Sequence, residues 1–345
     1  MFTSPFRRRS ILAAALCLAA LLPARSEAQT PAPAPVRFSW DWAPQGYHAI
    51  WALAEERGLF RDAGLRVQMD RGYGSGDTIS KVATGAYDVG FADVNALVQF
   101  NARNPDRRVI AVQMVFDTNP AAVVTLRRSG IRTAADLRGR NLGAPEGESS
   151  RVLFPVFARA AGVDASTIRW TSMTANLRET MLATGQVEAI TGLQMAAVFS
   201  LRAAGVPAQD IVVLPYAAAG VDLYGHGIIT SAAFAESHPE VLRGFLRASL
   251  GGLRAALADP AAGMAAMKRR EPLFDEALEL ERFAMARDVA ILTDGVRQKG
   301  FGTMEPDRMA RLVAINAEVN QIANPPAPES LYSTAYLPPL ADRMP

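Results

Sequence analysis

Short apolar runs alternate along the chain with longer segments in which apolar positions recur at helical spacing. The short runs predict strands at 36–40, 66–69, 89–91, 109–115, 122–126, 141–144, 168–171, 189–192 and 211–214. The longer segments predict helices at 47–57, 78–84, 95–101, 150–160, 177–184 and 196–203. This alternation is typical of an α/β fold in which mostly parallel sheets carry helices on both faces.

The N-terminus has the layout of a secretory signal peptide. Arginines at 7–9 precede an apolar run at 11–22, and small residues follow up to Ala28. The apolar run is about a dozen residues long, whereas a bilayer span needs about 20. We expect cleavage after Ala28, with Ala24 as the alternative, and both the Sec and the twin-arginine export routes fit. The mature protein is therefore expected to be periplasmic, starting with a Pro/Ala-rich spacer at 29–35.

Cleavage would remove the single cysteine, Cys17. The mature chain would then have no thiol for a disulfide, a nucleophile or a thiolate metal site. Residues 1–28 also carry four arginines and one glutamate, so the net charge would change from +2 to about −1. This balance gives no reason to expect nucleic acid as a partner. The three histidines lack zinc-site spacing and no nucleophile elbow is present, so we expect no metal, no cofactor and no catalytic residue.

Four sequence motifs together carry a family resemblance. They are WDWAPQGYH at 40–48, GLF at 58–60, GL at 64–65 and GAYDVGFAD at 85–93. These motifs closely resemble the opening of the NMT1/THI5-like (SsuA/THI5-like) family, whose members are mostly extracytoplasmic solute-binding proteins of ABC importers. The resemblance implies a monomer that captures a small solute and delivers it to a permease and ATPase complex in the inner membrane.

The resemblance also implies an organisation of the chain. Family members fold as a type II periplasmic-binding-protein clamshell of two lobes, and the chain crosses between the lobes twice. The first lobe is then expected at 36–122 plus 226–320, and the second at 123–225. An irregular C-terminal tail at 321–345 completes the chain. Ligand is expected between the lobes, at the carboxyl ends of the strands, where open sheets generally bind.

One cytoplasmic branch of the family consists of thiamine-pyrimidine synthases, which are enzymes. In that branch, a lysine that holds pyridoxal phosphate and a histidine consumed as substrate follow an Asp-x-Gly motif. Aligned on 88–90, this chain has Ala92 and Ala96 at those positions. Without the amine no Schiff base forms, so we expect that this protein is not an enzyme. A ligand-sensing partner of a receptor is a third alternative.

Candidate ligand contacts follow the predicted strand ends of the first lobe. Trp42 can stack on a flat solute or pack beneath the surface between the lobes. Pro44 restricts the turn that presents Tyr47 and His48, and His48 either bonds the ligand or caps a helix end. In the glycine-bearing turn at 73–78, Ser75 either contacts the ligand or serves only as an N-cap.

Acidic side chains are frequent at the predicted strand ends, and two or three of the five are expected to touch the ligand. They are Asp41, Asp93, Asp117, Glu146 and Glu148. A solute with N–H donors, such as a nitrogen heterocycle resembling the thiamine pyrimidine, suits these acceptors better than taurine, an alkanesulfonate or nitrate, which are the alternatives. Asp77, in the first glycine-bearing turn, also disfavours an anion.

The second lobe and the return crossing supply further candidates. Ser149 lies in a second glycine-bearing turn, Gln194 follows a strand, and Tyr224 lies on the return crossing, whereas His226 is expected to be structural. The complete set of expected ligand contacts is Trp42, Tyr47, His48, Ser75, Asp77, Asn95, Asp117, Glu146, Ser149, Gln194 and Tyr224.

Overall fold

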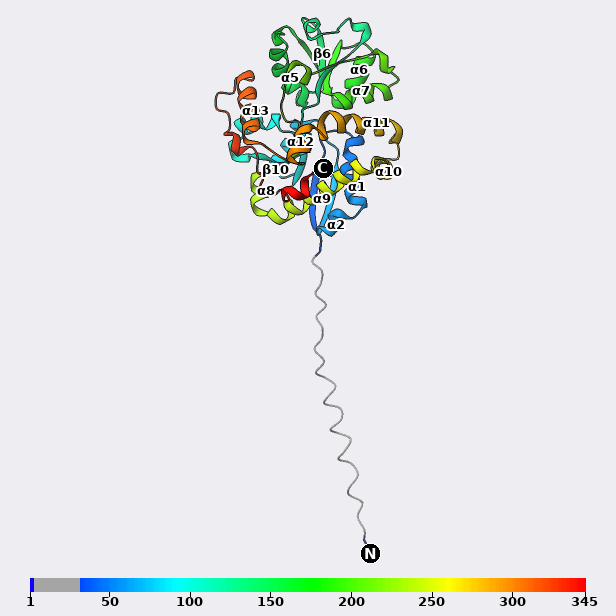
Figure 1. The fold of residues 1–345 in the computed structure, drawn as a ribbon, viewed down its shortest axis with the longest axis vertical. Helices are drawn as coiled ribbons and strands as arrows, with labels where there is room; N and C mark the ends of the chain where they lie inside the picture. Colours follow the sequence, from blue (N-terminus) through cyan, green and yellow to red (C-terminus); the bar gives the residue numbers. More distant parts are fainter. Residues whose placement is uncertain (3–31) are drawn as a thin grey trace. The chain divides into compact units, whose positions relative to one another are not determined.

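Two five-stranded sheets organise the segment Pro33–Pro345, as Figure 1 shows. The computed structural model describes residues 1–2 and 32–345. Residues 3–31 lie outside the described residues, and they include Cys17, both candidate cleavage positions and the first three residues of the predicted spacer. Among the described residues, no helix combines the length and the apolar character needed to cross a membrane.

The first sheet has the strand order β2-β1-β3-β10-β4. Its strands are β1 (Ala34–Ser39), β2 (Leu65–Asp70), β3 (Val89–Asp93), β4 (Val109–Met114) and β10 (His226–Ser231). Strand β1 pairs in parallel with β2 and β3, whereas β10 runs antiparallel to both β3 and β4. Four strands therefore share one direction and β10 is reversed.

The second sheet repeats this arrangement with the order β7-β6-β8-β5-β9. Its strands are β5 (Ala121–Leu126), β6 (Asn141–Ala144), β7 (Arg169–Ser172), β8 (Ala189–Leu193) and β9 (Ile211–Pro215). Here β5 is the reversed strand, because it pairs antiparallel with β8 and β9 while β6 pairs in parallel with β7 and β8. The prediction of two mostly parallel sheets flanked by helices is confirmed.

The two reversed strands have a simple physical cause. Each is the first strand after the chain passes from one sheet to the other. Ala121 at the start of β5 pairs with Leu193 at the end of β8, and His226 at the start of β10 pairs with Asp93 at the end of β3. The chain thus enters each sheet at the carboxyl ends of its parallel strands, and the entering strand must run in the opposite direction. The lobe boundaries themselves stay a prediction.

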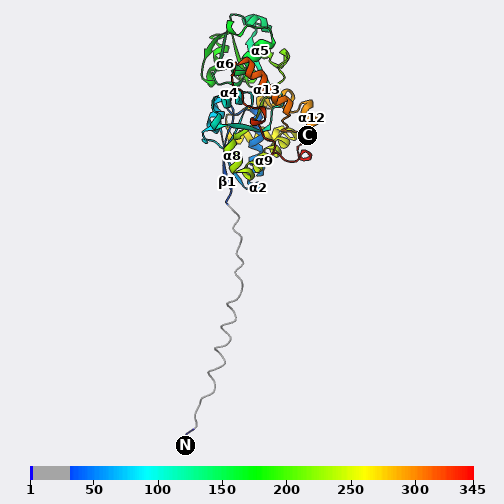
Figure 2. The same cartoon turned by 90° about the vertical axis from the view of Figure 1, so that its left-hand side faces the viewer.

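Helices cover both sheets, and Figure 2 shows α8 and α9 at the opposite end of this segment from α5 and α6. Those that follow the strands of the first sheet are η1 (Gly46–His48), α1 (Ala49–Glu56), α2 (Leu59–Asp62), α3 (Ser75–Ala83), α4 (Asn95–Arg103), α8 (Ala232–Ser237), α9 (Pro239–Ala258), α10 (Pro260–Arg270), α12 (Asp294–Lys299) and α13 (Pro306–Val319). Those of the second sheet are α5 (Ser149–Ala160), α6 (Arg178–Ala183) and α7 (Gln194–Ala203). Helix α11 (Glu276–Ala286) contacts both η1 and α7 and so joins the two halves.

Aromatic side chains fill the core beneath the first sheet. Phe38 of β1 packs edge-on against Trp51 of α1 and Phe245 of α9, and Trp51 also contacts Phe91 of β3. All four side chains are fully buried, and burial of such large apolar surfaces is the main stabilising contribution to a fold of this size. This core fixes the end of β1, from which the chain enters the site.

Candidate functional site

A small cavity with a free volume of about 10 Å³, roughly the space of one water molecule, lies where the facing ends of the strands of the two sheets meet. The first lobe, which we define as the first sheet with its helices, lines the cavity with Asp41, Trp42, Tyr47, Gly74, Ser75 and His226. The second lobe lines it with Glu148, Ser149, Arg178, Leu193 and Ala196. Several of these residues directly follow the carboxyl ends of parallel strands, which is where open α/β sheets generally bind ligands.

The carboxylate of Asp41 is held in place at the cavity by a chain of hydrogen bonds. Its Oδ1 lies 2.9 Å from Nε2 of His48, and Nδ1 of His48 accepts a hydrogen bond of 3.0 Å from the backbone N–H of Gln45. Because Nδ1 is an acceptor, Nε2 carries the proton and donates it to Asp41. Burial lowers the pKa of His48, although Asp41 opposes that shift. The neutral imidazole of His48 therefore positions the carboxylate by donating a hydrogen bond to it.

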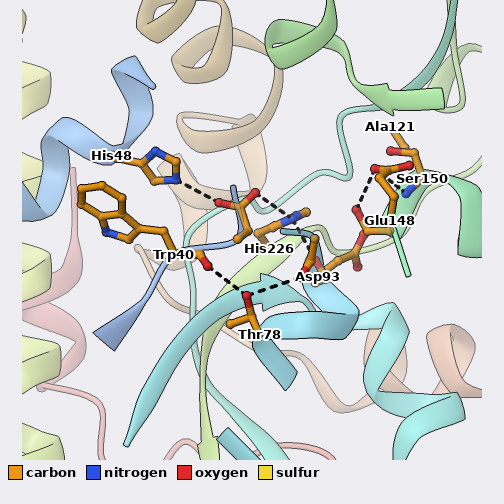
Figure 3. A network of polar contacts seen from close by, with 12 residues as sticks. Trp40, His48, Thr78, Asp93, Ala121, Glu148, Ser150 and His226 are labelled. Atoms are coloured by element: carbon orange, nitrogen blue, oxygen red, sulfur yellow. Dashed lines mark hydrogen bonds and ion pairs between the residues drawn. The ribbon is translucent and has the colours of Figure 1, made fainter. Parts of the chain in front are cut away.

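The ring of His48 is itself fixed by its surroundings. Figure 3 shows it beside Trp40, on which it stacks with the ring centroids 4.6 Å apart and the planes 11° from parallel. His226 lies on the other side of Asp41, with its Nε2 3.5 Å from Oδ2 of the carboxylate. This separation is too long for a strong hydrogen bond, so Oδ2 keeps acceptor capacity.

Two polar atoms of the cavity-lining residues have no protein partner. Within residues 1–2 and 32–345, neither the hydroxyl of Tyr47 nor Nδ1 of His226 makes a hydrogen bond. Burial raises the pKa of Tyr47 well above its usual range, so its hydroxyl stays protonated and can donate. Buried polar groups without partners are uncommon in folded proteins. Both residues line the cavity, so these atoms are candidates for contact with a solute.

Ser75 connects the cavity to a buried polar network behind it. Its hydroxyl accepts a hydrogen bond of 3.0 Å from the backbone N–H of Asp93 and lies 3.3 Å from Nε2 of His226. The Asp93 carboxylate accepts from Nδ2 of both Asn95 (2.7 Å) and Asn119 (2.8 Å). Burial raises the pKa of Asp93. Asn95 and Asn119 also reach the carbonyl oxygen of Tyr224, so this network ties the return crossing to the first sheet.

The second-lobe wall is built from a helix start and a buried arginine. Glu148 is the N-cap of α5, and Figure 3 shows it beside Ser150, whose backbone N–H it accepts at 3.0 Å. Arg178 is only 2% exposed, and its Nη2 lies 2.6 Å from Oε1 of Glu179. The centre of its guanidinium lies 4.6 Å from the centre of the Trp42 ring in the first lobe. This cation–π contact therefore crosses between the lobes.

Four of the predicted contacts line the cavity: Trp42, Tyr47, Ser75 and Ser149. Three others lie behind it or at the crossings. His48 holds Asp41, Asn95 belongs to the buried network, and the hydroxyl of Tyr224 accepts a hydrogen bond from the backbone of Glu305. For all of the predicted residues, direct contact with a ligand stays a prediction.

The remaining predicted residues have local partners away from the cavity lining. Asp77 lies 2.7 Å from Nζ of Lys81, and Asp117 accepts from Nη1 of Arg308 at 3.0 Å. Glu146 accepts from the hydroxyl of Ser172 at 3.0 Å. The side-chain amide of Gln194 lies 3.7 Å from Sδ of Met285. The alternative role of Ser75 as an N-cap is wrong, because α3 begins at Ser75 with Gly74 as its N-cap.

Four polar side chains that line the cavity are not among the predicted contacts: Asp41, Glu148, Arg178 and His226. Asp41 and Glu148 are two of the five acidic residues noted at strand ends, so the charge pattern contained a signal for them. His226 was expected to be structural, and Arg178 carried no local signal. The cavity lining thus has two carboxylates and one guanidinium, and the guanidinium is already paired with Glu179. Acceptors outnumber free cationic donors.

Two lobes that enclose a cavity at their facing strand ends define the architecture of the periplasmic binding proteins. The sequence model described as NMT1/THI5 like matches residues 45–263 of the chain. The protein therefore belongs to the NMT1/THI5-like family, as its motifs predict.

Curated relatives include both binding proteins and an enzyme. The riboflavin-binding protein RibY of Chloroflexus aurantiacus is 27% identical over 72% of this chain and 72% of its own length. The formylaminopyrimidine-binding protein of Halalkalibacterium halodurans is 26% identical over 64% and 66%, respectively. A 4-amino-5-hydroxymethyl-2-methylpyrimidine phosphate synthase of Aspergillus parasiticus is 25% identical over 66% and 68%.

A solved structure supports the fold. The alkanesulfonate-binding protein SsuA from Xanthomonas axonopodis pv. citri, bound to MOPS, superposes with a TM-score of 0.64. The match covers 89% of this chain and 98% of that protein at 17% sequence identity. At this identity the similarity establishes the shared fold and says nothing about the solute.

Proposed function

We propose that this protein is the solute-binding component of an ABC importer, acts in the periplasm, and captures a small nitrogen-containing heteroaromatic molecule between its lobes. Membership of the NMT1/THI5-like family supports the binding role. The signal-peptide pattern of the N-terminus supports export. Two relatives are named for solutes of this chemical class, riboflavin and formylaminopyrimidine.

The observation that carries this proposal is the state of Asp41. Neutral His48 donates to Oδ1, whereas Nε2 of His226 lies 3.5 Å from Oδ2, which is too far for a strong hydrogen bond. A carboxylate held in this way is a prepared acceptor for an N–H or amino group, and hydrogen bonds to charged acceptors contribute about 1.5–3 kcal/mol each. The unpartnered hydroxyl of Tyr47 adds a donor for a ring nitrogen or carbonyl. The ring of Trp42 adds a flat apolar surface.

The free space in the cavity does not rank the heteroaromatic candidates by size. Its volume is about 10 Å³, which is roughly the space of one water molecule, so a solute of any ring size enters only when the lobes separate. We place a pyrimidine ahead of a flavin because the sequence motifs resemble a family with a thiamine-pyrimidine branch.

An anionic solute is the second candidate, and Arg178 is the observation in its favour. This guanidinium lines the cavity and could hold a sulfonate. Asp41 and Glu148 line the same cavity, however, and their charges would repel an anion. Arg178 is also already paired with Glu179. These charges rank a sulfonate below a neutral heterocycle with N–H donors.

The proposal does not include catalysis, although one relative is named as a synthase. Ala92 of β3 and Ala96 of α4 stand where the resemblance places the lysine and histidine of the synthase branch. An alanine side chain cannot form a Schiff base with pyridoxal phosphate. The absence of the lysine and the histidine at these two positions supports a binding role over that reaction.

A thermal-shift screen tests the proposal with formylaminopyrimidine, riboflavin, MOPS and taurine as probes. A ligand at about 100 times its dissociation constant adds roughly 2.7 kcal/mol to the stability of the folded state. We expect the largest shift with formylaminopyrimidine and none with taurine. A shift with MOPS or taurine alone would overturn the proposed solute class while keeping a binding role.

A matched pair of tryptophan substitutions then tests the cavity. Trp42 and Trp170 each carry an arginine over the ring, at 4.6 Å and 4.8 Å, but Trp170 lies in β7 and does not line the cavity. We expect Trp42→Ala to weaken binding of formylaminopyrimidine by about 1–3 kcal/mol. Trp170→Ala should leave the affinity unchanged. Equal effects in isothermal titration calorimetry would show that Trp42 acts through the fold.

A further inference from the structure

Two glycine-bearing turns from opposite lobes meet beside the cavity. One follows β2 and leads into α3, and the other follows β6 and leads into α5. The backbone N–H of Gly76 donates a hydrogen bond of 3.1 Å to the carbonyl oxygen of Gly147. The two backbones therefore touch without any side chain between them.

A side chain on Gly76 would collide with the backbone of the opposite lobe. A Cβ atom on Gly76 would lie 3.1 Å from the carbonyl oxygen of Gly147 and 3.3 Å from its Cα, and one on Gly74 would lie 3.3 Å from the same oxygen. Both distances at Gly76 are shorter than ordinary van der Waals contact. Gly76 is in the first turn of α3, where alanine would otherwise be the better residue for helix stability. The close approach of the other lobe accounts for glycine at this position.

The contact lies directly next to residues that line the cavity. Gly74 and Ser75 line it on the first-lobe side, and Glu148 and Ser149 line it on the second-lobe side. The hydrogen bond between Gly76 and Gly147 therefore joins the two rims one residue away from the enclosed space. Separation of the lobes would break this bond, because its donor and acceptor belong to different lobes.

We propose that Gly76 and Gly147 form a backbone latch that holds the lobes closed over a bound solute and sets how long the solute stays. This inference rests on the proposed solute-binding function. The latch contributes only in the closed conformation, so it shifts the equilibrium between the open and closed states toward closure. Because it uses backbone atoms, it acts on any solute that the closed cavity can hold.

A wedge series at Gly76 tests the latch with formylaminopyrimidine as the probe. Alanine and leucine both favour a helix more than glycine does, so Gly76→Ala and Gly76→Leu should not lower the Tm of the ligand-free protein. Affinity should fall in proportion to the population able to close, modestly for Gly76→Ala and about tenfold or more for Gly76→Leu. Stopped-flow measurements should place the loss mainly in a faster dissociation rate. An unchanged affinity of Gly76→Leu would overturn the latch.

Gly244→Ala is the matched control for the series. Gly244 lies inside α9, and a Cβ there would meet its nearest neighbour in the first lobe, the carbonyl oxygen of Ala63, at 3.4 Å. The substitution adds the same methyl group to a helix of the first lobe without approaching the second lobe. Its affinity for formylaminopyrimidine should match the wild type. A loss equal to that of Gly76→Ala would show that the effect is a general one of helix substitution and would overturn the latch.

Amide hydrogen exchange followed by NMR tests the latch without changing either glycine. Gly76 is in the first turn of α3, where backbone N–H groups have no partner within the helix, so its protection depends on the carbonyl oxygen of Gly147. We expect formylaminopyrimidine to slow exchange at Gly76 by about tenfold or more. Binding of this probe without slower exchange at Gly76 would overturn the latch. If the wild type binds no probe, the solute proposal fails, and exchange at Gly76 in the ligand-free protein as fast as in an unfolded peptide would still overturn the contact between the two turns.

Discussion

The two walls of the cavity are held in place by different means. In the first-lobe wall, Asp41 is fixed by His48, which is fixed in turn by Gln45 and Trp40, and all four residues belong to the same lobe. In the second-lobe wall, the guanidinium of Arg178 lies over a tryptophan of the opposite lobe. The first wall is therefore held entirely from within its own lobe, whereas Arg178 of the second wall is paired with Glu179 and also contacts the opposite lobe.

This difference indicates a division of roles. A preorganised acceptor selects the solute at little cost in side-chain entropy, because its geometry does not change on binding. A wall that contacts the opposite lobe instead couples the presence of the solute to lobe movement, as expected for hinge motion around a ligand. The first wall would then set specificity, and the second wall and the glycine latch would set retention.

The largest expected effect is a loss of stability when His48, which supports Asp41 in the first wall, is removed. We expect His48→Ala to lower the free energy of unfolding by about 3–4 kcal/mol, because it leaves a void beside Trp40 and removes the partners of Asp41 and the Gln45 backbone. Urea denaturation followed by circular dichroism measures this loss. His238→Ala, at an exposed histidine, is the control and should change stability by less than about 0.5 kcal/mol. Similar losses in both variants would contradict a preassembled first wall.

A smaller effect is expected from the second wall, and it should appear in binding. Arg178→Lys keeps the positive charge beside Glu179 but loses the planar group that stacks on Trp42. Binding of formylaminopyrimidine should weaken by about 1–2 kcal/mol, while the ligand-free protein unfolds at nearly the same urea concentration. Arg169→Lys, at an exposed arginine of the same lobe, should change neither quantity. An equal loss of ligand-free stability and of affinity for Arg178→Lys would show that both walls are preassembled.

The smallest expected effect is a pH dependence of stability that comes from His48. Because burial lowers its pKa in the folded state from the ordinary value of 6.5, the unfolded chain binds more protons as the pH falls. The contribution of neutral His48 is complete above pH 6.5 and is lost as the pH falls toward its lowered value. Between pH 7.5 and 6, this group should cost the wild type up to about 0.8 kcal/mol.

A His48→Gln variant isolates this pH contribution, because glutamine does not titrate. Asp93 and Glu279 have raised pKa values, so their contributions have the opposite sign and are lost as the pH rises. Both remain in the variant, and the difference between the two proteins reports His48 alone. Urea midpoints measured at both pH values should fall more for the wild type. Parallel curves would contradict a neutral His48 in the folded protein.

The elements of the fold follow from local patterns in the sequence. The predicted strand at 141–144 matches β6, and the predicted helix at 95–101 lies within α4, because apolar spacing reports which face of each element is buried. The reversed direction of β5 and β10 was not encoded locally. It follows from where each chain crossing enters its sheet, which depends on the whole topology.

The sequence predicts those residues of the candidate site that follow the ends of strands. Trp42 follows β1 and Ser149 follows the turn after β6, so position along the chain was sufficient to find them. Asn95 also follows a strand end, but its side chain turns toward the return crossing, and spacing along one strand does not report that direction. Arg178 and His226 reach the cavity through contacts between distant segments, which no local pattern describes.

Isothermal titration calorimetry of formylaminopyrimidine against the wild type and two aspartate variants tests the central claim most directly. Asp41→Asn keeps the shape of the side chain and removes the charged acceptor, whereas Asp77→Asn makes the same change at a residue paired with Lys81 outside the cavity lining. We predict that Asp41→Asn weakens binding by roughly 10- to 100-fold and that Asp77→Asn binds as the wild type does. Equal affinity for Asp41→Asn and the wild type would contradict the account, as would a wild type that binds MOPS and no heterocycle.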